Sequence, residues 1–147
     1  RTAKVEDIVL GPGKTSLKAG EFVVSFFLPT RPKRSGDAYL RFIPRTEMDI
    51  AVVGASVSLT LDKAGVCSDA RVSLGAVAPK PLLVAKAARA IVGTKVDDEA
   101  LPQLSLAASA ACDPIDDKRG TVEYRTKVAG VLARRAATIA LERARGN

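Results

Sequence analysis

Three groups of residues have the types and spacing that could carry out chemistry, and the first lies near the start of the chain. The segment Gly11-Pro12-Gly13-Lys14-Thr15 contains the glycines, lysine and threonine of a phosphate-binding loop. Such a loop needs a longer spacing before its Gly-Lys-Ser/Thr end, and a helix must follow so that amide groups point at the phosphate. Neither feature is present, so the sequence predicts a turn here.

The second group is a cluster of aspartates, Asp113 with Asp116-Asp117. Carboxylates at this spacing could bind a divalent metal or act as acid and base. No further ligands are evident elsewhere in the sequence. Aspartates directly before a helix commonly accept hydrogen bonds from its free amides. We therefore expect a capping role, with Lys118, Arg119 or Arg125 as ion-pair partners.

The third group consists of the two cysteines, Cys67 and Cys112, both in apolar surroundings. Two cysteines form neither a disulfide framework nor a four-thiolate metal site, and their surroundings favour buried, reduced thiols. The chain contains no histidine, which excludes Ser-His-Asp and Cys-His mechanisms and histidine-ligated metals. The sequence thus predicts no catalytic residue and no metal ligand.

The elements that must position any site are strands first and helices later. Residues 22–28 are rich in β-formers and apolar on both faces, which predicts a strand covered on both sides. A short strand is expected at 38–43. Strict alternation over 53–61 predicts a half-buried antiparallel strand, and 67–74 returns beside it as a hairpin.

The period then changes, and three helices are expected. Residues 82–91 form helix-favouring sequence, and the acidic residues 97–99 suit the first turn of a helix over 98–112. A last helix runs to about Arg143. Its apolar stripe at helical spacing comprises Tyr124, Val128, Val131, Leu132 and Ile139. The predicted fold is α+β, a small antiparallel β-sheet followed by a three-helix layer.

Length and composition place these elements in one domain with a flank. The chain has 147 residues, of which 47% are hydrophobic. A polar linker with proline and glycine over 30–36 marks a boundary between subdomains. No apolar run reaches membrane-spanning length and no signal peptide is present, so we expect a cytoplasmic location. The chain opens at Arg1 without an initiator methionine, and we expect it to be a piece of a longer protein.

The charge of the chain favours an acidic partner or an anionic ligand. The formal net charge is +7. Tryptophan is absent and aromatic residues make up only 4%, so a base-stacking surface for nucleic acid is poorly supplied. The arginines Arg134-Arg135, Arg143 and Arg145 form either a solvated helix face or a docking patch for an acidic partner. A stand-alone basic module that binds nucleic acid or an acidic protein is the alternative function.

Three separated segments carry a resemblance to a known family. They read YLRFIPRTEMDIAVVG at 39–54, ARVSLGAVAPKP at 70–81, and PIDDKRGTVEYR at 114–125 followed by VLARRA at 131–136. In the same order, they closely resemble the FAD-binding (medium) subunits of the xanthine dehydrogenase / aerobic carbon monoxide dehydrogenase family.

The resemblance implies a division of the chain into two parts. Residues 35–147 look like the flavoprotein C-terminal domain, and residues 1–34 look like the tail of the preceding FAD-binding domain plus a linker. The chain departs from the family pattern at Ile8-Val9, where paired phenylalanines are usual, and at Arg41, where lysine is common. The family's glycine-rich loops for the pyrophosphate belong to the domain before Arg1.

The resemblance also implies a cofactor, partners and a role. The cofactor is FAD, bound mainly by the preceding domain, with molybdopterin on a large partner subunit and [2Fe-2S] clusters on a small one. Electrons would pass from the substrate through these centres to FAD and on to an acceptor such as NAD. The chain would be part of an oxidoreductase flavoprotein subunit in a heteromer, not catalytic alone, and it would bind no nucleic acid.

Three cofactor-binding residues follow from the family pattern. Val23 would sit beside the flavin ring, Arg41 would place its cation near it, and Tyr39 would be a near neighbour of Arg41 on the same strand face. A cation beside the flavin N1–C2=O edge stabilises the reduced form and raises its potential. Two alternatives stay open: Arg41 as a rim charge on an edge strand, and Tyr39 as an aromatic that packs on the sheet.

Overall fold

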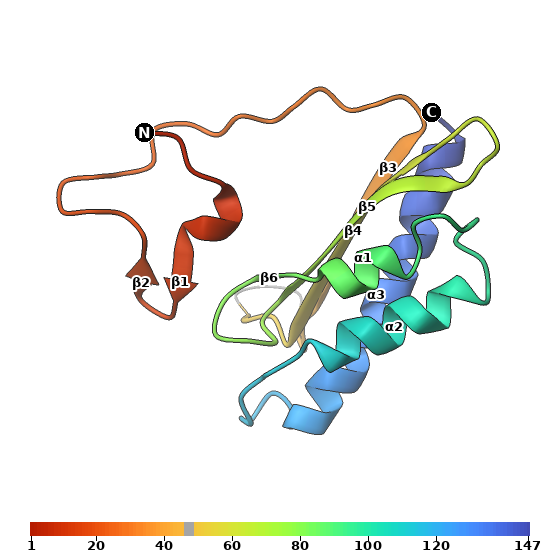
Figure 1. Cartoon of the computed structure of the whole chain (residues 1–147). Helices are drawn as coiled ribbons and strands as arrows, with labels where there is room; N and C mark the ends of the chain where they lie inside the picture. The colour runs from red at the N-terminus through yellow and green to blue at the C-terminus, as the bar shows by residue number, and fades with distance from the viewer. Residues whose placement is uncertain (46–48) are drawn as a thin grey trace.

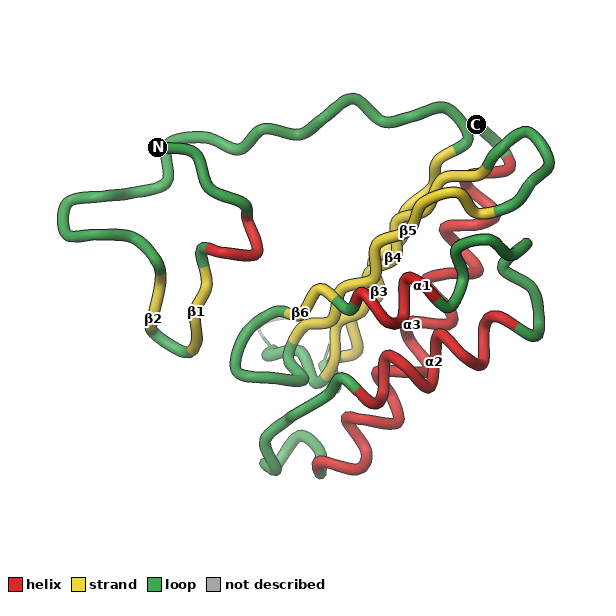
Figure 2. Tube along the Cα trace, viewed as in Figure 1, coloured by secondary structure: helices red, strands yellow, loops and turns green. Residues whose placement is uncertain are grey.

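The computed structural model describes residues 1–45 and 49–147. Part of the first family-like segment, residues 46–48, therefore lies outside the described residues. Figures 1 and 2 show a small N-terminal unit, an extended connection, and a sheet with helices on one face. The order of elements, strands before helices, confirms the predicted α+β fold.

The main sheet has four strands in the order β3-β4-β5-β6, and every pairing is antiparallel. Its strands are β3 (Ser35–Phe42), β4 (Val53–Leu61), β5 (Cys67–Gly75) and β6 (Leu82–Leu83). The three longer strands confirm the expected segments 38–43, 53–61 and 67–74, including the β4–β5 hairpin. Alternation sets the two faces of this sheet, because successive side chains of a strand point to opposite sides.

The inner face of the sheet is apolar and buried beneath the helices. On β4 it carries Val53, Ala55, Val57, Leu59 and Leu61, all of them buried. The opposite side of β4 carries glycine, serine and threonine. We call that side of the sheet the outer face. It is turned away from the helices and towards the N-terminal unit (Figure 1).

The helices are α1 (Ala85–Arg89), α2 (Ala100–Ala110) and α3 (Val122–Arg145). The predicted helix over 82–91 is therefore too long at its start. Leu82 and Leu83 pair as strand β6 with Leu74 and Ser73, because the edge of β5 offers them backbone hydrogen bonds. The second helix begins two residues later than predicted, so the acidic residues 97–99 precede its first turn and do not form it. The Asp97 carboxylate accepts hydrogen bonds from the amides of Glu99 and Ala100 at this start.

The face of α3 that packs on β3 and β4 is made of small side chains. Its buried alanines are Ala129, Ala133, Ala136, Ala137, Ala140 and Ala144. The predicted stripe was placed partly on the wrong side, because Tyr124 is 44% exposed and Val131 is 40% exposed. Alanine brings the helix close to the sheet, whereas large residues would hold it away. Among the helices of the described residues, none is long and apolar enough to cross a bilayer.

Two glycines mark the closest approaches in this layer. A Cβ at Gly36 of β3 would overlap the carbonyl oxygen of Ala140 and lie 2.6 Å from the Ala144 nitrogen. A Cβ at Gly130 of α3 would lie 2.7 Å from the Ser105 hydroxyl oxygen of α2. Only glycine fits at either contact, since real Cβ atoms do not approach so closely.

The N-terminal unit contains a 3-10 turn, η1 (Val5–Asp7), and a small hairpin of β1 (Val9–Gly11) and β2 (Lys14–Thr15). The predicted turn at 11–15 is confirmed, with Gly13 at a φ of 68°. Arg1 donates hydrogen bonds to the Glu21 carboxylate and thereby lowers the pKa of Glu21 to about 2. This contact joins the two ends of the unit.

Residues 22–28 do not form the predicted covered strand. The segment runs as extended chain between the N-terminal unit and β3 (Figure 1), with Phe22 76% exposed and Phe27 88% exposed. A strand needs a neighbour for its amide and carbonyl groups, and no strand among the described residues pairs with this segment. The apolar composition of residues 22–28 predicted burial, but it could not indicate whether a second strand lies beside them.

Candidate functional site

The predicted site residues Tyr39 and Arg41 lie two positions apart on β3, so both side chains are on the outer face of the sheet. Across the strand pair, Tyr39 lies opposite Ser56 and Arg41 lies opposite Gly54. The Tyr39 ring lies over Gly54, since a Cβ at that position would be 2.9 Å from the Tyr39 hydroxyl oxygen. Tyr39 is still 62% exposed, so the ring packs on the sheet and keeps one side accessible.

The outer face beside these two residues carries only small side chains, and we call this part of it the glycine and serine floor. Gly54 lies opposite Gly75 of β5, and Ser56 lies opposite Ser73. The positions of β4 and β5 that lie beside Tyr39 and Arg41 thus carry only glycine and serine. The Tyr39 ring covers this floor at Gly54, whereas Gly75 and the two serines leave room for a flat ring system beside Tyr39, which offers an aromatic ring, and Arg41, which offers a cation.

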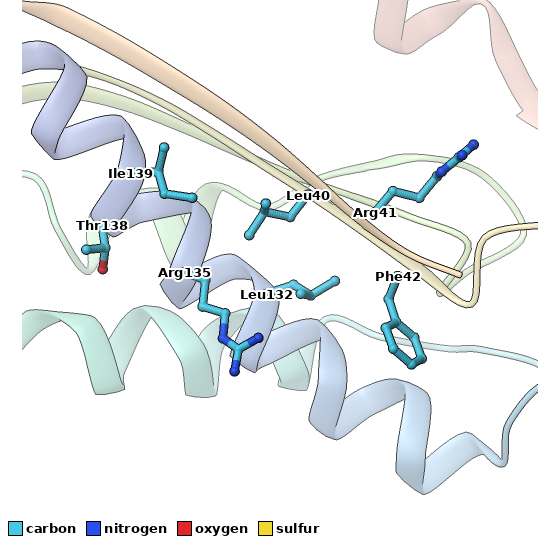
Figure 3. Close-up of a pocket in the computed structure, with 7 residues that line it drawn as sticks. All are labelled: Leu40, Arg41, Phe42, Leu132, Arg135, Thr138 and Ile139. Atoms are coloured by element: carbon cyan, nitrogen blue, oxygen red, sulfur yellow. The ribbon is translucent and has the colours of Figure 1, made fainter. Parts of the chain in front are cut away.

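The Arg41 guanidinium is free to act on a ligand. Among the residues that the structure describes, no acidic side chain or carbonyl forms an ion pair or hydrogen bond with it. In Figure 3 its side chain points away from α3, in the opposite direction to the neighbouring Phe42. Arg41 is therefore an exposed cation at the rim of the glycine and serine floor.

A cleft of about 400 Å³ lies between the outer face and the N-terminal unit. The sheet contributes Ser56, Ser58, Arg71 and Ser73 to its wall, and the N-terminal unit contributes Val5, Glu6 and Val9. Sequence reasoning missed this cleft because the polar positions of 53–61 and 67–74 indicated only a solvated face. The one available signal was the small size of those polar side chains.

Val23, the third predicted site residue, lies elsewhere. It belongs to the extended connection and is 45% exposed. Neither the cleft nor the groove drawn in Figure 3 includes it. The structure therefore brings Tyr39 and Arg41 together and leaves Val23 in a separate segment.

The aspartate cluster forms the predicted ion pairs, because Asp117 pairs with Arg119 and Arg125, but it does not cap the last helix as predicted. Thr121, not an aspartate, caps α3 by accepting a hydrogen bond from the Tyr124 amide. Asp117 instead accepts hydrogen bonds from the Arg119 amide at 2.8 Å and from Arg125 at 2.6 Å. These bonds lower the pKa of Asp117. The described residues contain no group of three side chains that could hold a metal ion.

Both cysteines are free thiols, as predicted. Cys67, the first residue of β5, is buried, and Cys112, which follows α2, is partly buried. Burial raises the pKa of each thiol to about 11. Thiolates are the reactive form, so neither residue is poised as a nucleophile.

A family model and curated relatives match most of this chain. The CO dehydrogenase flavoprotein C-terminal domain family matches residues 38–140. The carbon monoxide dehydrogenase medium chain of Afipia carboxidovorans is 37% identical over 145 residues, which cover 99% of this chain and 50% of that protein. A putative xanthine dehydrogenase FAD-binding subunit of Escherichia coli is 28% identical over 137 residues, 92% of this chain and 47% of the relative.

Solved structures share the fold as well. Reconstituted CO dehydrogenase from Oligotropha carboxidovorans superimposes with a TM-score of 0.88 at 36% identity, over 94% of this chain and 48% of the other. The chain thus spans about half the length of the curated relatives it matches. The sequence segments, the strand order and the helix layer agree with one assignment: the chain belongs to the CO dehydrogenase flavoprotein C-terminal domain family.

Proposed function

We propose that the chain is the C-terminal part of the FAD-binding subunit of a molybdenum hydroxylase-type oxidoreductase. The observation that carries the proposal is a glycine and serine floor with an exposed aromatic ring and a free cation at its edge, in a chain of this family. Residues 35–147 form the flavoprotein C-terminal domain in this proposal, and residues 1–34 are the tail of the FAD-binding domain plus linker.

The exposed connection supports this division. Phe22, Val24, Phe26 and Leu28 are each at least 70% exposed, and a run of large apolar side chains of this kind normally lies against other protein. The matched relatives are about twice as long as this chain. We infer that the additional FAD-binding domain covers the connection and that Val23 approaches the flavin ring there.

The outer face would close over one side of the flavin. Tyr39 would contact the ring, and the Arg41 guanidinium would approach its N1–C2=O edge. FAD would supply an electron carrier between one-electron and two-electron donors and acceptors. The contribution of this chain is to exclude water from one face of the ring and to favour negative charge on it. Arginine keeps the charge of the lysine common at this position, with a wider, planar donor fork.

The partners follow from the same proposal. Medium chains and FAD-binding subunits among the relatives are named as parts of larger dehydrogenases. We infer that this subunit assembles in the cytoplasm with a small [2Fe-2S] subunit and a large molybdopterin subunit. Electrons would arrive from the clusters and leave to an acceptor such as NAD.

Native purification of the full-length subunit with its companion chains tests the cofactor. FAD should co-purify in a one-to-one ratio with the subunit, and its absence would refute the proposal. The 147-residue chain alone should bind FAD weakly or not at all, because the pyrophosphate loops belong to the preceding domain. If the chain is instead a stand-alone basic module, it should bind nucleic acid with steep salt dependence.

Substitution of Arg41 tests the site in the FAD-loaded subunit. Arg41→Met should lower the midpoint potential of the flavin by roughly 20 mV, which is the effect of losing one exposed charge contact. Arg41→Lys should keep most of it. Lys63→Met, in the turn at the other end of the β4–β5 hairpin, is the matched control. Equal potentials in the Arg41→Met variant and the control would exclude a role for Arg41 at the flavin.

A further inference from the structure

Strand β3 is an edge strand, and half of its outer backbone edge is open. The Leu61 amide donates to the Arg34 carbonyl, and the Val52 amide donates to the Phe42 carbonyl. Hydrogen bonds to β4 therefore come from the even-numbered residues of β3, because bonded and non-bonded pairs alternate in an antiparallel ladder. The backbone groups of Tyr39 and Arg41 point away from β4.

The first half of this edge is closed by the end of α3. Asn147 donates to the Ser35 carbonyl at 3.0 Å, and Arg143 donates to the Asp37 carbonyl at 2.6 Å. For the backbone of Tyr39 and Arg41, no such partner exists among residues 1–45 and 49–147. Proteins usually protect exposed strand edges, because free amides and carbonyls pair readily with another extended chain.

An apolar groove of about 510 Å³ lies beside the open half, between β3 and α3. Figure 3 shows Leu40 and Phe42 turned towards α3, where Leu132 and Ile139 face them. Arg135 stands at the rim of the groove. A chain paired with the edge at Tyr39 and Arg41 would place alternate side chains over this groove and the others beside Arg41, on the outer face.

The charge around the groove selects the occupant. In the described part of the chain, neither Arg41 nor Arg135 has an acidic partner, and the whole chain carries a net charge of +7. A second copy pairing at the same edge would bring two sets of these arginines together, which opposes self-association. A segment that turns its apolar side chains into the groove turns the alternate ones to the outer face, where acidic residues would gain from Arg41.

We propose that the open half of the β3 edge binds an extended segment of a partner polypeptide in which apolar and acidic residues alternate. Its backbone pairs with Tyr39 and Arg41, its apolar side chains fill the groove against Leu40 and Ile139, and its carboxylates meet Arg41 on the outer face. This mode of recognition extends a sheet by one strand, with main-chain bonds for affinity and pockets for specificity. It needs no bound flavin.

A short fluorescent peptide of alternating valine and glutamate is the probe, with an alternating valine and lysine peptide as its control. The acidic peptide should bind the 147-residue chain, and the basic one should not. Arg41→Glu should weaken binding about fivefold or more, since it turns an attraction for the glutamates on the outer face into a repulsion. Arg134→Glu makes the same charge change at an exposed arginine that does not line the groove and should change affinity less than twofold.

Hydrogen exchange locates the peptide. The amides of Tyr39 and Arg41 should exchange more slowly in the complex, because they then donate to the added strand. Absence of binding overturns the proposal. Equal weakening by the two arginine variants overturns it too, because that result indicates attraction to net charge alone. Self-association of the chain through Tyr39 and Arg41, seen by light scattering and hydrogen exchange, would show that a second copy is the occupant.

Discussion

Replacing Arg125 by methionine should destabilise the fold by about 3 kcal/mol, although the residue lies outside the proposed site. The Arg125 side chain is only 4% exposed. It donates to the carbonyls of Val52 at 2.9 Å, Gly120 at 3.2 Å and Ala76 at 3.4 Å, and it pairs with Asp117 at 2.6 Å. One guanidinium therefore joins α3, the start of β4, the end of β5 and the loop before α3.

The magnitude follows from which partners can recover. Gly120 and Ala76 lie nearer the surface, so water can replace the donor there, but Val52 is fully buried. An unsatisfied buried acceptor costs roughly 1–3 kcal/mol, and removal of one partner from a buried charge network costs about 3–5 kcal/mol. Methionine keeps the apolar length of the side chain, so packing losses stay small. The expected loss corresponds to a melting temperature roughly 10 °C lower.

Urea denaturation of the wild type and the Arg125→Met variant measures this effect. Arg134→Met on the exposed side of the same helix is the control and should lie within about 0.5 kcal/mol of the wild type. A loss of less than about 1 kcal/mol for Arg125→Met would refute the reasoning. It would mean that the buried carbonyl of Val52 finds another donor.

The same variant should change the response to acid. The pKa of Asp117 is lowered, first by the Arg119 amide and then by Arg125. A lowered native pKa stabilises the fold above the unfolded value of about 3.9, and this contribution is lost as the pH falls towards the native value. The Arg125→Met variant retains only part of it, so its stability should fall less between pH 5 and pH 2 than that of the wild type. Parallel acid limbs would contradict the pairing.

Three further predictions concern close contacts and thiols. Gly36→Ala should cost about 3 kcal/mol or more in urea denaturation, because the new Cβ would meet rigid helix backbone at Ala140; wild-type stability would refute it. Gly130→Ala should cost about 1–3 kcal/mol, since the Ser105 hydroxyl and carbonyl oxygens stand 2.7 Å and 2.8 Å from the added carbon, and an unchanged unfolding midpoint would contradict that contact. Cys67 should resist a thiol reagent at neutral pH until the chain is denatured, because burial raises its pKa to about 11; rapid labelling of the native chain would argue against it.

Structural features that depend on residues close together in the sequence were predicted well. The alternation over 53–61 fixed a strand and its buried side, because a period of two has one physical explanation in a half-buried sheet. The turn at Gly13 and the acidic entry at Asp97 also follow from short-range backbone chemistry. The strand that carries Tyr39 and Arg41 was predicted in the same way, and so was their shared face.

Structural features that depend on contact with another segment were predicted poorly. Residues 22–28 are apolar enough for a covered strand, yet no described strand lies beside them. The stripe on α3 was drawn through large residues such as Val131, whereas the contact with the sheet is made by alanines. Hydrophobicity ranks large residues first, but close approach of a helix to a sheet selects small ones.

The sequence by itself determined the order of strands and helices, the alternation of the sheet and the family of the chain. Each depends on neighbouring residues or on segments that keep their order. Only the tertiary structure decided that glycine and serine from two strands form the low floor beside Tyr39 and Arg41. It also decided that Arg125 joins four segments, and that the end of α3 closes one half of the β3 edge. Those features depend on distances between residues far apart in the chain, which local patterns do not specify.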